Sequence, residues 1–224
     1  MKFLKSDQKK ARLRDSLLFF FLPPRCPVCK AYGTRLLCPT CREQLKEAFH
    51  PHSFLASGGN GYADGMFTLF HYRERTVKHL LRDWKRENYR DLPLIFDPYV
   101  KMLVQKKLLP GKIHRITYLP RRKPTRFKTG FDQAEQIGAL FAKSINLPLE
   151  ALLQRQGNAK VQHKQKYKHR EKNVRGAFRA TQPLAGETVL VIDDIVTTGA
   201  TAREGARILK RAGAMKVYVL SLAH

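Results

Sequence analysis

The segment from residue 189 to residue 201 constrains the fold more than any other part of this 224-residue sequence. It begins with four consecutive apolar residues, which indicate a strand buried on both faces, as in parallel sheets covered by helices. Asp193 and Asp194 follow, and a turn rich in Thr and Gly then opens a helix. Ligands of open α/β sheets bind at the carboxyl ends of strands, so the two carboxylates stand where a binding site is expected.

The chemistry of this segment fits a phosphorylated sugar. The free N–H groups and the positive dipole end of the following helix suit a phosphate. The hydroxyls of Thr197, Thr198 and Thr201 add donors, and Gly199 lets the backbone approach closely. Paired carboxylates accept hydrogen bonds from a sugar diol and tolerate a nearby divalent cation. The segment therefore predicts ribose hydroxyls at 193–194 and a 5′-phosphate at 197–201. The alternative is an acidic turn and a capped helix without a ligand.

The rest of the chain alternates between strand and helix patterns, which predicts a parallel α/β sheet with crossover connections. The apolar spacing of Val77, Leu80, Leu81 and Trp84 is that of one helix face. Residues 51–61 read as a linker. The predicted strands are 65–72, 113–119, 150–155, 187–193 and 215–222, and the predicted helices are 41–49, 73–88, 94–107, 132–146 and 201–213.

All four cysteines lie close together, as Cys26-x2-Cys29 and Cys38-x2-Cys41. Each Cys-x2-Cys turn aims two thiolates at one point, and two such turns make a tetrahedral sulfur site that suits a structural zinc ion. A redox pair or an iron–sulfur cluster are the alternatives. A closed zinc site leaves no open coordination position, so no catalysis is assigned to it. Reduced thiolates also indicate a cytoplasmic location.

The N-terminal segment combines basic residues with a six-residue apolar run that ends at Pro23 and Pro24. That run is too short for a membrane span and has no small-residue cleavage site after it. Residues 11–22 are expected to form an amphipathic helix or an apolar lead-in, with membrane-surface contact as the alternative. The sequence thus predicts a lead-in at 1–25, a zinc-binding knuckle at 26–50 and an α/β domain at 62–224.

The formal net charge of +25 is unusual for a chain of this size and implies a polyanionic partner. Two basic segments, 112–131 and 155–179, flank the predicted ligand site and contain aromatic residues. Such a surface can follow a single nucleic-acid strand through phosphate contacts and base stacking, and the alternative is a solvated basic surface. The candidate nucleic-acid-binding residues are Lys123, Arg126, Lys128, Lys164, Lys166, Lys168, Arg170, Lys172 and Arg175.

Several motifs together resemble the ComF family, the competence-associated group that includes ComFC- and GntX-like proteins. Residues 193–201 resemble the phosphoribosyl-pyrophosphate (PRPP) motif of type I phosphoribosyltransferases. The other matching features, in family order, are the cysteine knuckle after a Phe/Leu-Pro-Pro lead-in, Phe70-His71-Tyr72 with the helix through Trp84-Lys85, Gly130-Phe131-Asp132-Gln133-Ala134-Glu135, and Gln162 with Arg170 and residues 173–178. The resemblance covers residues 17–222.

The resemblance implies a type I phosphoribosyltransferase-like core that binds PRPP together with Mg²⁺. It implies that Arg121 and Arg122 are candidates for the pyrophosphate loop and that residues 156–175 replace the usual flexible loop. Thr129 and Asp132 depart from the Arg and Asn usual in the family, and no acid–base constellation identifies catalytic residues. The implied PRPP-binding residues are Asp193, Asp194, Ile195, Val196, Thr197, Thr198, Gly199, Ala200 and Thr201.

Three functions are compatible with these features. The first is a competence protein that handles incoming single-stranded DNA during natural transformation and binds PRPP or a nucleotide. By resemblance, its partners are a DNA-uptake helicase and a single-strand-handling protein. The second is an active phosphoribosyltransferase that transfers ribose 5-phosphate to a base-like acceptor. The third is a regulator that senses nucleotides without turnover.

Overall fold

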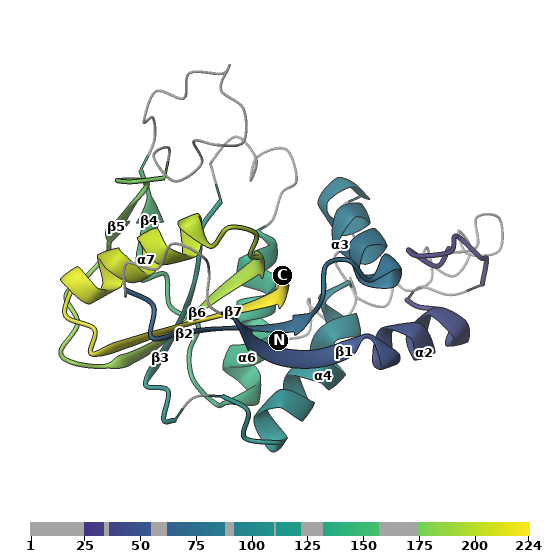
Figure 1. Cartoon of the computed structure of the whole chain (residues 1–224), viewed down its shortest axis with the longest axis horizontal. Helices are drawn as coiled ribbons and strands as arrows, with labels where there is room; N and C mark the ends of the chain where they lie inside the picture. The colour runs from purple at the N-terminus through teal and green to yellow at the C-terminus, as the bar shows by residue number, and fades with distance from the viewer. Residues whose placement is uncertain are drawn as a thin grey trace, which may run out of the picture.

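A five-stranded sheet in the order β1-β2-β7-β6-β3 forms the centre of the computed structural model (Figure 1). The structure describes residues 25–33, 36–54, 62–87, 92–109, 111–121, 132–156 and 174–224. Four neighbouring strands are parallel: β2 (Gly65–Phe70), β7 (Lys216–Ala223), β6 (Thr188–Ile195) and β3 (Arg115–Tyr118). The parallel core expected from the sequence is confirmed.

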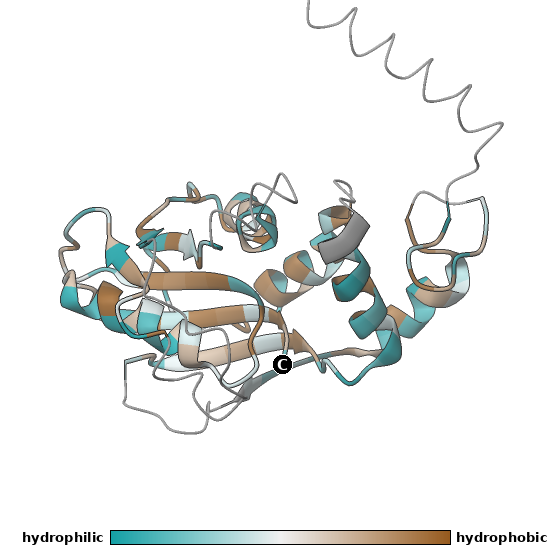
Figure 2. Cartoon of the chain, turned by 90° about the horizontal axis from the view of Figure 1, so that it is seen from above, coloured by the Kyte–Doolittle hydropathy of each residue, from teal (hydrophilic) through white to brown (hydrophobic). Residues whose placement is uncertain are grey.

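Strand β6 is buried on both faces, as its apolar run predicts. Val189 and Val191 belong to one apolar cluster, and Leu190 and Ile192 belong to the other. This division follows the alternation of side chains along a strand. In Figure 2 the central strands are mostly brown, the colour of hydrophobic residues. The sheet therefore separates two cores, one on each face.

Helices cover both faces of the sheet. The helices α3 (Arg75–Glu87), α4 (Pro93–Gln105) and α6 (Gln133–Ser144) contribute to the cluster that contains Leu190. On α3 the predicted apolar stripe is buried, and Trp84 stacks on Phe96 of α4 with ring centroids 6.0 Å apart. The helix α7 (Ala200–Arg211) contributes to the opposite cluster.

The predicted strand at 150–155 does not extend the main sheet. Leu149 makes an isolated parallel bridge to Ile116 beside β3. The chain then continues as β4 (Leu153–Arg155), which pairs antiparallel with β5 (Phe178–Ala180). Leu153 and Phe178 are buried in the same cluster as α7 residues, so this ladder packs on the α7 side of the sheet. Burial against α7 places the strand outside the main sheet.

Residues 51–54 are not a linker, and that part of the prediction was wrong. They belong to β1 (Phe49–Phe54), an edge strand that pairs antiparallel with β2. Pro51 lies where the register shifts between Phe49 and His52, which agrees with the restriction of proline to edges and bulges. Phe49 fixes the strand through ring contacts with Phe70 at 5.7 Å and Tyr99 at 5.1 Å. Residues 55–61 lie outside the described residues.

The cysteine-containing segment is packed on the core. Its helix α2 (Pro39–Glu47) begins two residues earlier than predicted, because Pro39 occupies the first helical position. Leu45 is fully buried, and Cys26 and Cys41 share the apolar cluster of Trp84 and Phe96. The ammonium group of Lys30 also lies 2.6 Å from the carboxylate of Asp83 on α3. This segment is therefore anchored on α3.

None of the helices in the described ranges combines the length and hydrophobicity that a membrane-crossing segment requires. The expected lead-in helix at 11–22 lies outside those ranges. The same holds for Arg122, Lys123, Arg126, Lys128, Lys164, Lys166, Lys168, Arg170 and Lys172.

Candidate functional site

The two acidic residues of the predicted motif lie at the carboxyl end of β6. Successive side chains of a strand point to opposite faces, so the two carboxylates diverge. Asp194 is buried, and Asp193 is half-buried. Oδ1 of Asp193 accepts the N–H of Asp194 at 2.8 Å, and Oδ1 of Asp194 accepts the N–H of Ile195 at 2.8 Å. Each carboxylate is thus held in place by the backbone of the next residue.

The turn after β6 opens α7 with an N-cap residue that has no side chain, and the hydroxyl of Thr198 accepts the N–H of Ala200 at 3.4 Å. Gly199 is the N-cap residue and has φ = 73°, a left-handed conformation that glycine adopts without strain. It has no side chain to accept the N–H groups of the first turn, and that turn contains no acidic residue. The guanidinium of Arg203 donates to the carbonyl of Thr198 at 2.9 Å, which adds positive charge beside the turn. These features suit an anion.

Arg121 connects the end of β3 to the acidic pair. Its Nη2 donates to Oδ2 of Asp194 at 2.6 Å, and both side chains are less than one-fifth exposed. Its backbone N–H donates to Oδ2 of Asp132 at 2.8 Å. The structure thus brings a predicted pyrophosphate-loop residue against a predicted ribose-binding residue.

Asp132 has a structural role that the sequence analysis missed. It is the N-cap of α6, where Oδ1 accepts the N–H of Ala134 at 3.1 Å, and it is 1% exposed. Burial raises the pKa of this carboxyl above its usual value, against the opposing effect of the Arg121 N–H and charge. The sequence did contain a signal for this role, because Asp is a preferred N-cap residue and Asp132 stands at the start of the predicted helix 132–146. The departure from Asn at this position preserves the cap, since both residues are good N-caps.

Arg175, the one described member of the predicted nucleic-acid set, is exposed beside α7. The N–H of the next residue, Gly176, donates to Oε1 of Glu204 at 2.7 Å, and Arg207 donates two further hydrogen bonds to that carboxylate. Burial alone would raise the pKa of Glu204, but the bonds from Arg207 and Gly176 hold it below its usual value. The segment after residue 173 is therefore attached to the helix that follows the acidic pair.

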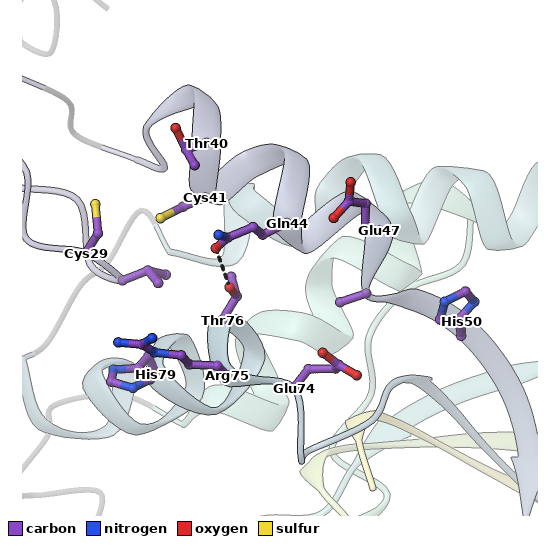
Figure 3. A pocket seen from close by; sticks show the side chains of 12 residues that line it. Cys29, Thr40, Cys41, Gln44, Glu47, His50, Glu74, Arg75, Thr76 and His79 are labelled. Carbon is purple, nitrogen blue, oxygen red and sulfur yellow. Dashed lines mark hydrogen bonds between the residues drawn. The ribbon is translucent and has the colours of Figure 1, made fainter.

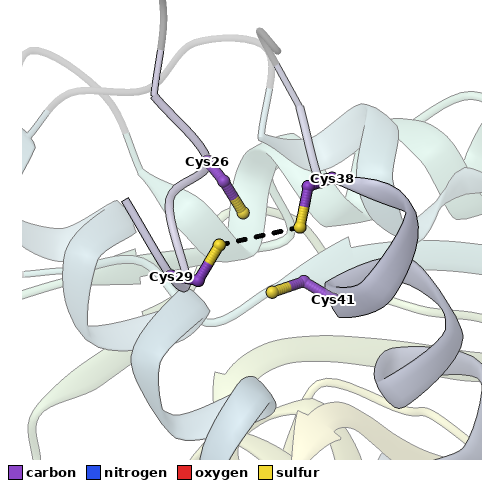
Figure 4. Close-up of side chains that lie close together, drawn as sticks. All are labelled: Cys26, Cys29, Cys38 and Cys41. Carbon is purple, nitrogen blue, oxygen red and sulfur yellow. Dashed lines mark hydrogen bonds between the residues drawn. The ribbon is translucent and has the colours of Figure 1, made fainter. Parts of the chain in front are cut away.

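The four cysteines form a compact cluster that can hold a metal ion (Figure 4). All four Sγ atoms lie within 4.8 Å of one another, and those of Cys29 and Cys38 are 3.6 Å apart. Zinc–sulfur bonds of about 2.3 Å in a tetrahedron place sulfur atoms about 3.8 Å apart, so the geometry fits. The residues come from the turn at 26–29 and from the start of α2.

The electrostatics of the cluster also favour a cation. Burial would raise the pKa of the Cys26 thiol, but backbone N–H groups of Cys38, Cys29 and Val28 lower it to about 7. Burial and the neighbouring thiols raise the pKa of Cys41 well above its usual value. One thiolate is therefore stabilised, while further ionisation is opposed until a cation balances the charge.

A cavity of about 480 Å³ lies between α2 and the first turn of α3 (Figure 3). Cys29, Cys41 and Arg75 are among the residues that line it, and the hydroxyl of Thr76 donates to Oε1 of Gln44 at 3.0 Å across it. Acidic and basic groups both face this cavity. It lies next to the cysteine cluster, and its lining includes no residue of the motif at 193–201.

Comparison with known proteins agrees with this architecture. A family model described as "Phosphoribosyl transferase domain" matches residues 135–223. The DNA utilization protein YhgH of Escherichia coli (strain K12) is 31% identical over 116 residues, or 51% of this chain and 49% of that protein. Competence protein F of Haemophilus influenzae is 24% identical over 102 residues, or 44% of each chain. The chain spans about half the length of the curated relatives it matches.

Two solved structures are also similar. Adenine phosphoribosyltransferase from Saccharomyces cerevisiae is 16% identical with a TM-score of 0.38, and the match covers 83% of this chain and 90% of that one. The allosteric regulatory enzyme of purine biosynthesis is 23% identical with the same TM-score, over 58% of this chain and 26% of that one.

The raised pKa of Asp132 predicts how stability depends on pH. The folded state holds this proton more tightly than the unfolded state, so the stabilisation is present at low pH and is lost as pH rises through the folded pKa. In Asp132→Asn, which retains an acceptor for Ala134, that titration is absent. The free energy of unfolding of wild type relative to this variant should therefore increase as pH falls from about 7 toward about 4.5. Urea unfolding followed by circular dichroism at each pH measures the difference.

Asp97→Asn removes one negative charge from α4, together with its ion pair to Lys101, and serves as the control for a change in net charge. A wild-type advantage over Asp132→Asn that stays constant or shrinks on acidification contradicts the prediction.

Proposed function

The chain belongs to the ComF family of phosphoribosyltransferase-like proteins, and from this premise we propose that it acts on incoming single-stranded DNA during natural transformation and binds PRPP or a nucleotide. The relatives named for competence and DNA utilization support the role with DNA. The proposed setting is the cytoplasm, with a DNA-uptake helicase and a single-strand-handling protein as partners.

One observation carries the ligand proposal. The N-terminus of α7, whose N-cap residue has no side chain, follows directly after Asp193 and Asp194, whose carboxylates are fixed by backbone N–H groups. The 5′-phosphate would accept hydrogen bonds from N–H groups at residues 197–201. The ribose hydroxyls would donate to Asp193 and Asp194. Arg121 would turn from Asp194 to the pyrophosphate, whose remaining charge Mg²⁺ would balance.

The DNA proposal rests on charge and on a contact between described residues of the two basic segments. The guanidinium of Arg155 donates to the carbonyl of Pro120 at 3.3 Å, so the described ends of both segments lie together. Arg121, the next residue, reaches Asp194. The residues that we propose to bind the strand belong to these two segments and are Lys123, Arg126, Lys128, Lys164, Lys166, Lys168, Arg170, Lys172 and Arg175.

The alternative function is catalytic transfer. In that reaction the bond from ribose C1 to pyrophosphate breaks, a bond from C1 to a nitrogen of the acceptor forms, that nitrogen loses its proton to solvent, and pyrophosphate leaves. The pairing of Arg121 with Asp194 supports this alternative, because a cation next to the proposed ribose-binding carboxylate could stabilise a leaving pyrophosphate. Release of pyrophosphate that requires a base distinguishes transfer from binding.

The cysteine cluster is proposed to hold one structural zinc ion on Cys26, Cys29, Cys38 and Cys41. When bound, the ion would neutralise the thiolates and join the turn at 26–29 to α2. Since this segment packs on Trp84 and Phe96, loss of the ion should disturb the core as well.

Metal removal tests this proposal. Elemental analysis of the purified chain should find about one zinc ion per molecule. A chelator, or Cys41→Ser, should lower the melting temperature and cause aggregation, because the segment would lose the ion that joins its cysteine ligands. Thr40→Ser, at the neighbouring position, should behave as wild type. Unchanged melting and solubility after complete metal removal would show that the cluster has no structural metal.

Substitution of Asp193 and Asp194 tests the ligand proposal. Asp193→Asn with Asp194→Asn keeps one side-chain oxygen at each position but removes both negative charges, so PRPP–Mg²⁺ affinity should fall at least about 100-fold, as expected when two hydrogen bonds to charged groups are lost. Calorimetric titration measures the affinity, and thermal unfolding checks the fold. Asp97→Asn serves as the control. Wild-type affinity in the folded double variant would refute the assignment of ribose hydroxyls to this pair.

Substitution of cations in the basic segment 155–179 tests the DNA proposal. Replacing Lys164, Lys166, Lys168 and Arg170 with Ala should weaken binding to oligothymidylate and flatten its salt dependence, since each lost phosphate contact removes about 0.7 from the slope of log affinity against log salt. PRPP binding should survive, because its donors are separate. Fluorescence anisotropy at several salt concentrations measures the slope. A wild-type slope in this variant would leave the segment without a DNA role and favour the catalytic alternative.

A further inference from the structure

The outer face of α3 carries cations at helical spacing. Arg75, Lys78 and Arg82 stand at i, i+3 and i+7, which places them along one side of the helix. All three are exposed, whereas Val77, Leu80, Leu81 and Trp84 are buried on the other side. We call these three cations the α3 basic face. At 1.5 Å per residue they extend over about 10 Å.

The α3 basic face has few acids beside it: Glu74 directly precedes Arg75 and, with Glu47, lines the same cavity. Within the described part of the chain, no ion pair involves Arg75 or Lys78. Arg82 lies 3.3 Å from Asp83, but Lys30 lies 2.6 Å from the same carboxylate. On other helices, Lys46 and Lys101 each pair with an acid on the same helix, whereas the exposed Lys106 and Lys143 have no ion pair within the described residues. The α3 basic face is therefore an excess of positive charge.

The α3 basic face begins at the same edge of the sheet as the candidate site. β2 ends at Phe70, and α3 begins five residues later at Arg75. Since β2 and β6 are both parallel to β7, their carboxyl ends meet at one edge of the sheet. The first turn of α3 therefore begins at the edge where Asp193 and Asp194 lie, and α3 stands next to that edge in Figure 1. Arg75 also faces the cavity beside α2 (Figure 3).

We propose that the α3 basic face is a second phosphate-contacting surface for single-stranded nucleic acid, separate from the two basic segments. The inference rests on the proposed role with DNA and extends it to Arg75, Lys78 and Arg82. A strand leaving the edge at residues 193–199 would continue along α3, and its phosphates would take the place of the missing carboxylates. The contacts are with the backbone, so base sequence has little effect on them.

A nucleic acid fits this face better than a membrane surface. A helix that lies on a bilayer places an apolar stripe into it. The apolar stripe of α3 is already buried against Phe96 and the rest of the core. What remains outside is a row of cations, which suits a chain of phosphates.

The test uses the full chain and two matched variants. The first replaces Arg75, Lys78 and Arg82 with Gln. The second replaces Lys106, Lys107 and Lys143 with Gln and removes the same charge from exposed positions at the opposite edge, where the ends of α4 and α6 meet. Each is measured with oligothymidylate by anisotropy from about 50 to 300 mM salt, a range over which phosphate contacts change affinity strongly. Circular dichroism and PRPP–Mg²⁺ titration check the fold.

The α3 variant should bind the oligonucleotide at least about tenfold more weakly than the control variant. The slope of log affinity against log salt should fall by about 2, from three contacts at about 0.7 each. PRPP binding should match wild type in both variants.

The outcomes separate this inference from the proposed function. Equal affinities and slopes in the two variants, with wild type and the loop variant behaving as proposed, overturn the inference alone. A wild-type chain that does not bind the oligonucleotide overturns both. Loss of affinity only for vesicles rich in phosphatidylserine, with oligonucleotide binding intact, overturns the assignment to nucleic acid.

Discussion

Burial of β6 on both faces is the constraint on which the rest of the structure depends. An apolar strand with no exposed face needs neighbours on both edges and a layer on each side. β7 and β3 supply the edges, the helices α3, α4 and α6 lie on one side, and α7 lies with the β4–β5 ladder on the other. Only the ends of such a strand reach solvent, so its polar residues, Asp193 and Asp194, stand at the edge of the sheet.

The cysteine segment and the candidate site depend on the same core in different ways. Cys26, Cys41 and Leu45 pack into the cluster of Trp84, so the metal-binding geometry is fixed partly by α3. Arg121 and Asp132 are positioned by the end of β3 and the start of α6, and α6 covers the same face of the sheet as α3. A distortion of this one core would therefore reach both sites.

Much of the architecture could be predicted from local patterns. The apolar run of β6, the 3.6-residue spacing on α3 and the Cys-x2-Cys pairs each point to one structure, and each is present. The errors arose where tertiary contacts determine the secondary structure and the strand pairing. β1 has a proline and two histidines in place of a clear alternation, and its strand conformation depends on pairing with β2 and on the rings around Phe49. The pairing of β4 with β5 joins residues 153–155 to residues 178–180, which no local pattern reveals.

The candidate site shows the same division. The motif at 193–201 located the acids, the turn and the start of the helix, because all of them are consecutive in sequence. The ion pair between Arg121 and Asp194 spans 73 positions, and the contact of Asp132 with Arg121 depends on how β3 and α6 meet. The sequence identified these residues as candidates or departures, but their interactions follow from the fold.

The ion pair between Arg121 and Asp194 has a consequence for selectivity. The two groups are mostly shielded from water, so separating them leaves a carboxylate and a guanidinium that each need a new partner. A free phosphate could satisfy the guanidinium but would repel the carboxylate, whereas an uncharged nucleoside could satisfy the carboxylate alone. Only a molecule that carries a hydroxyl donor and an anionic group at the right separation replaces both halves at once. The pair would therefore select for ligands that carry both groups and against free phosphate and uncharged nucleosides, each of which carries only one.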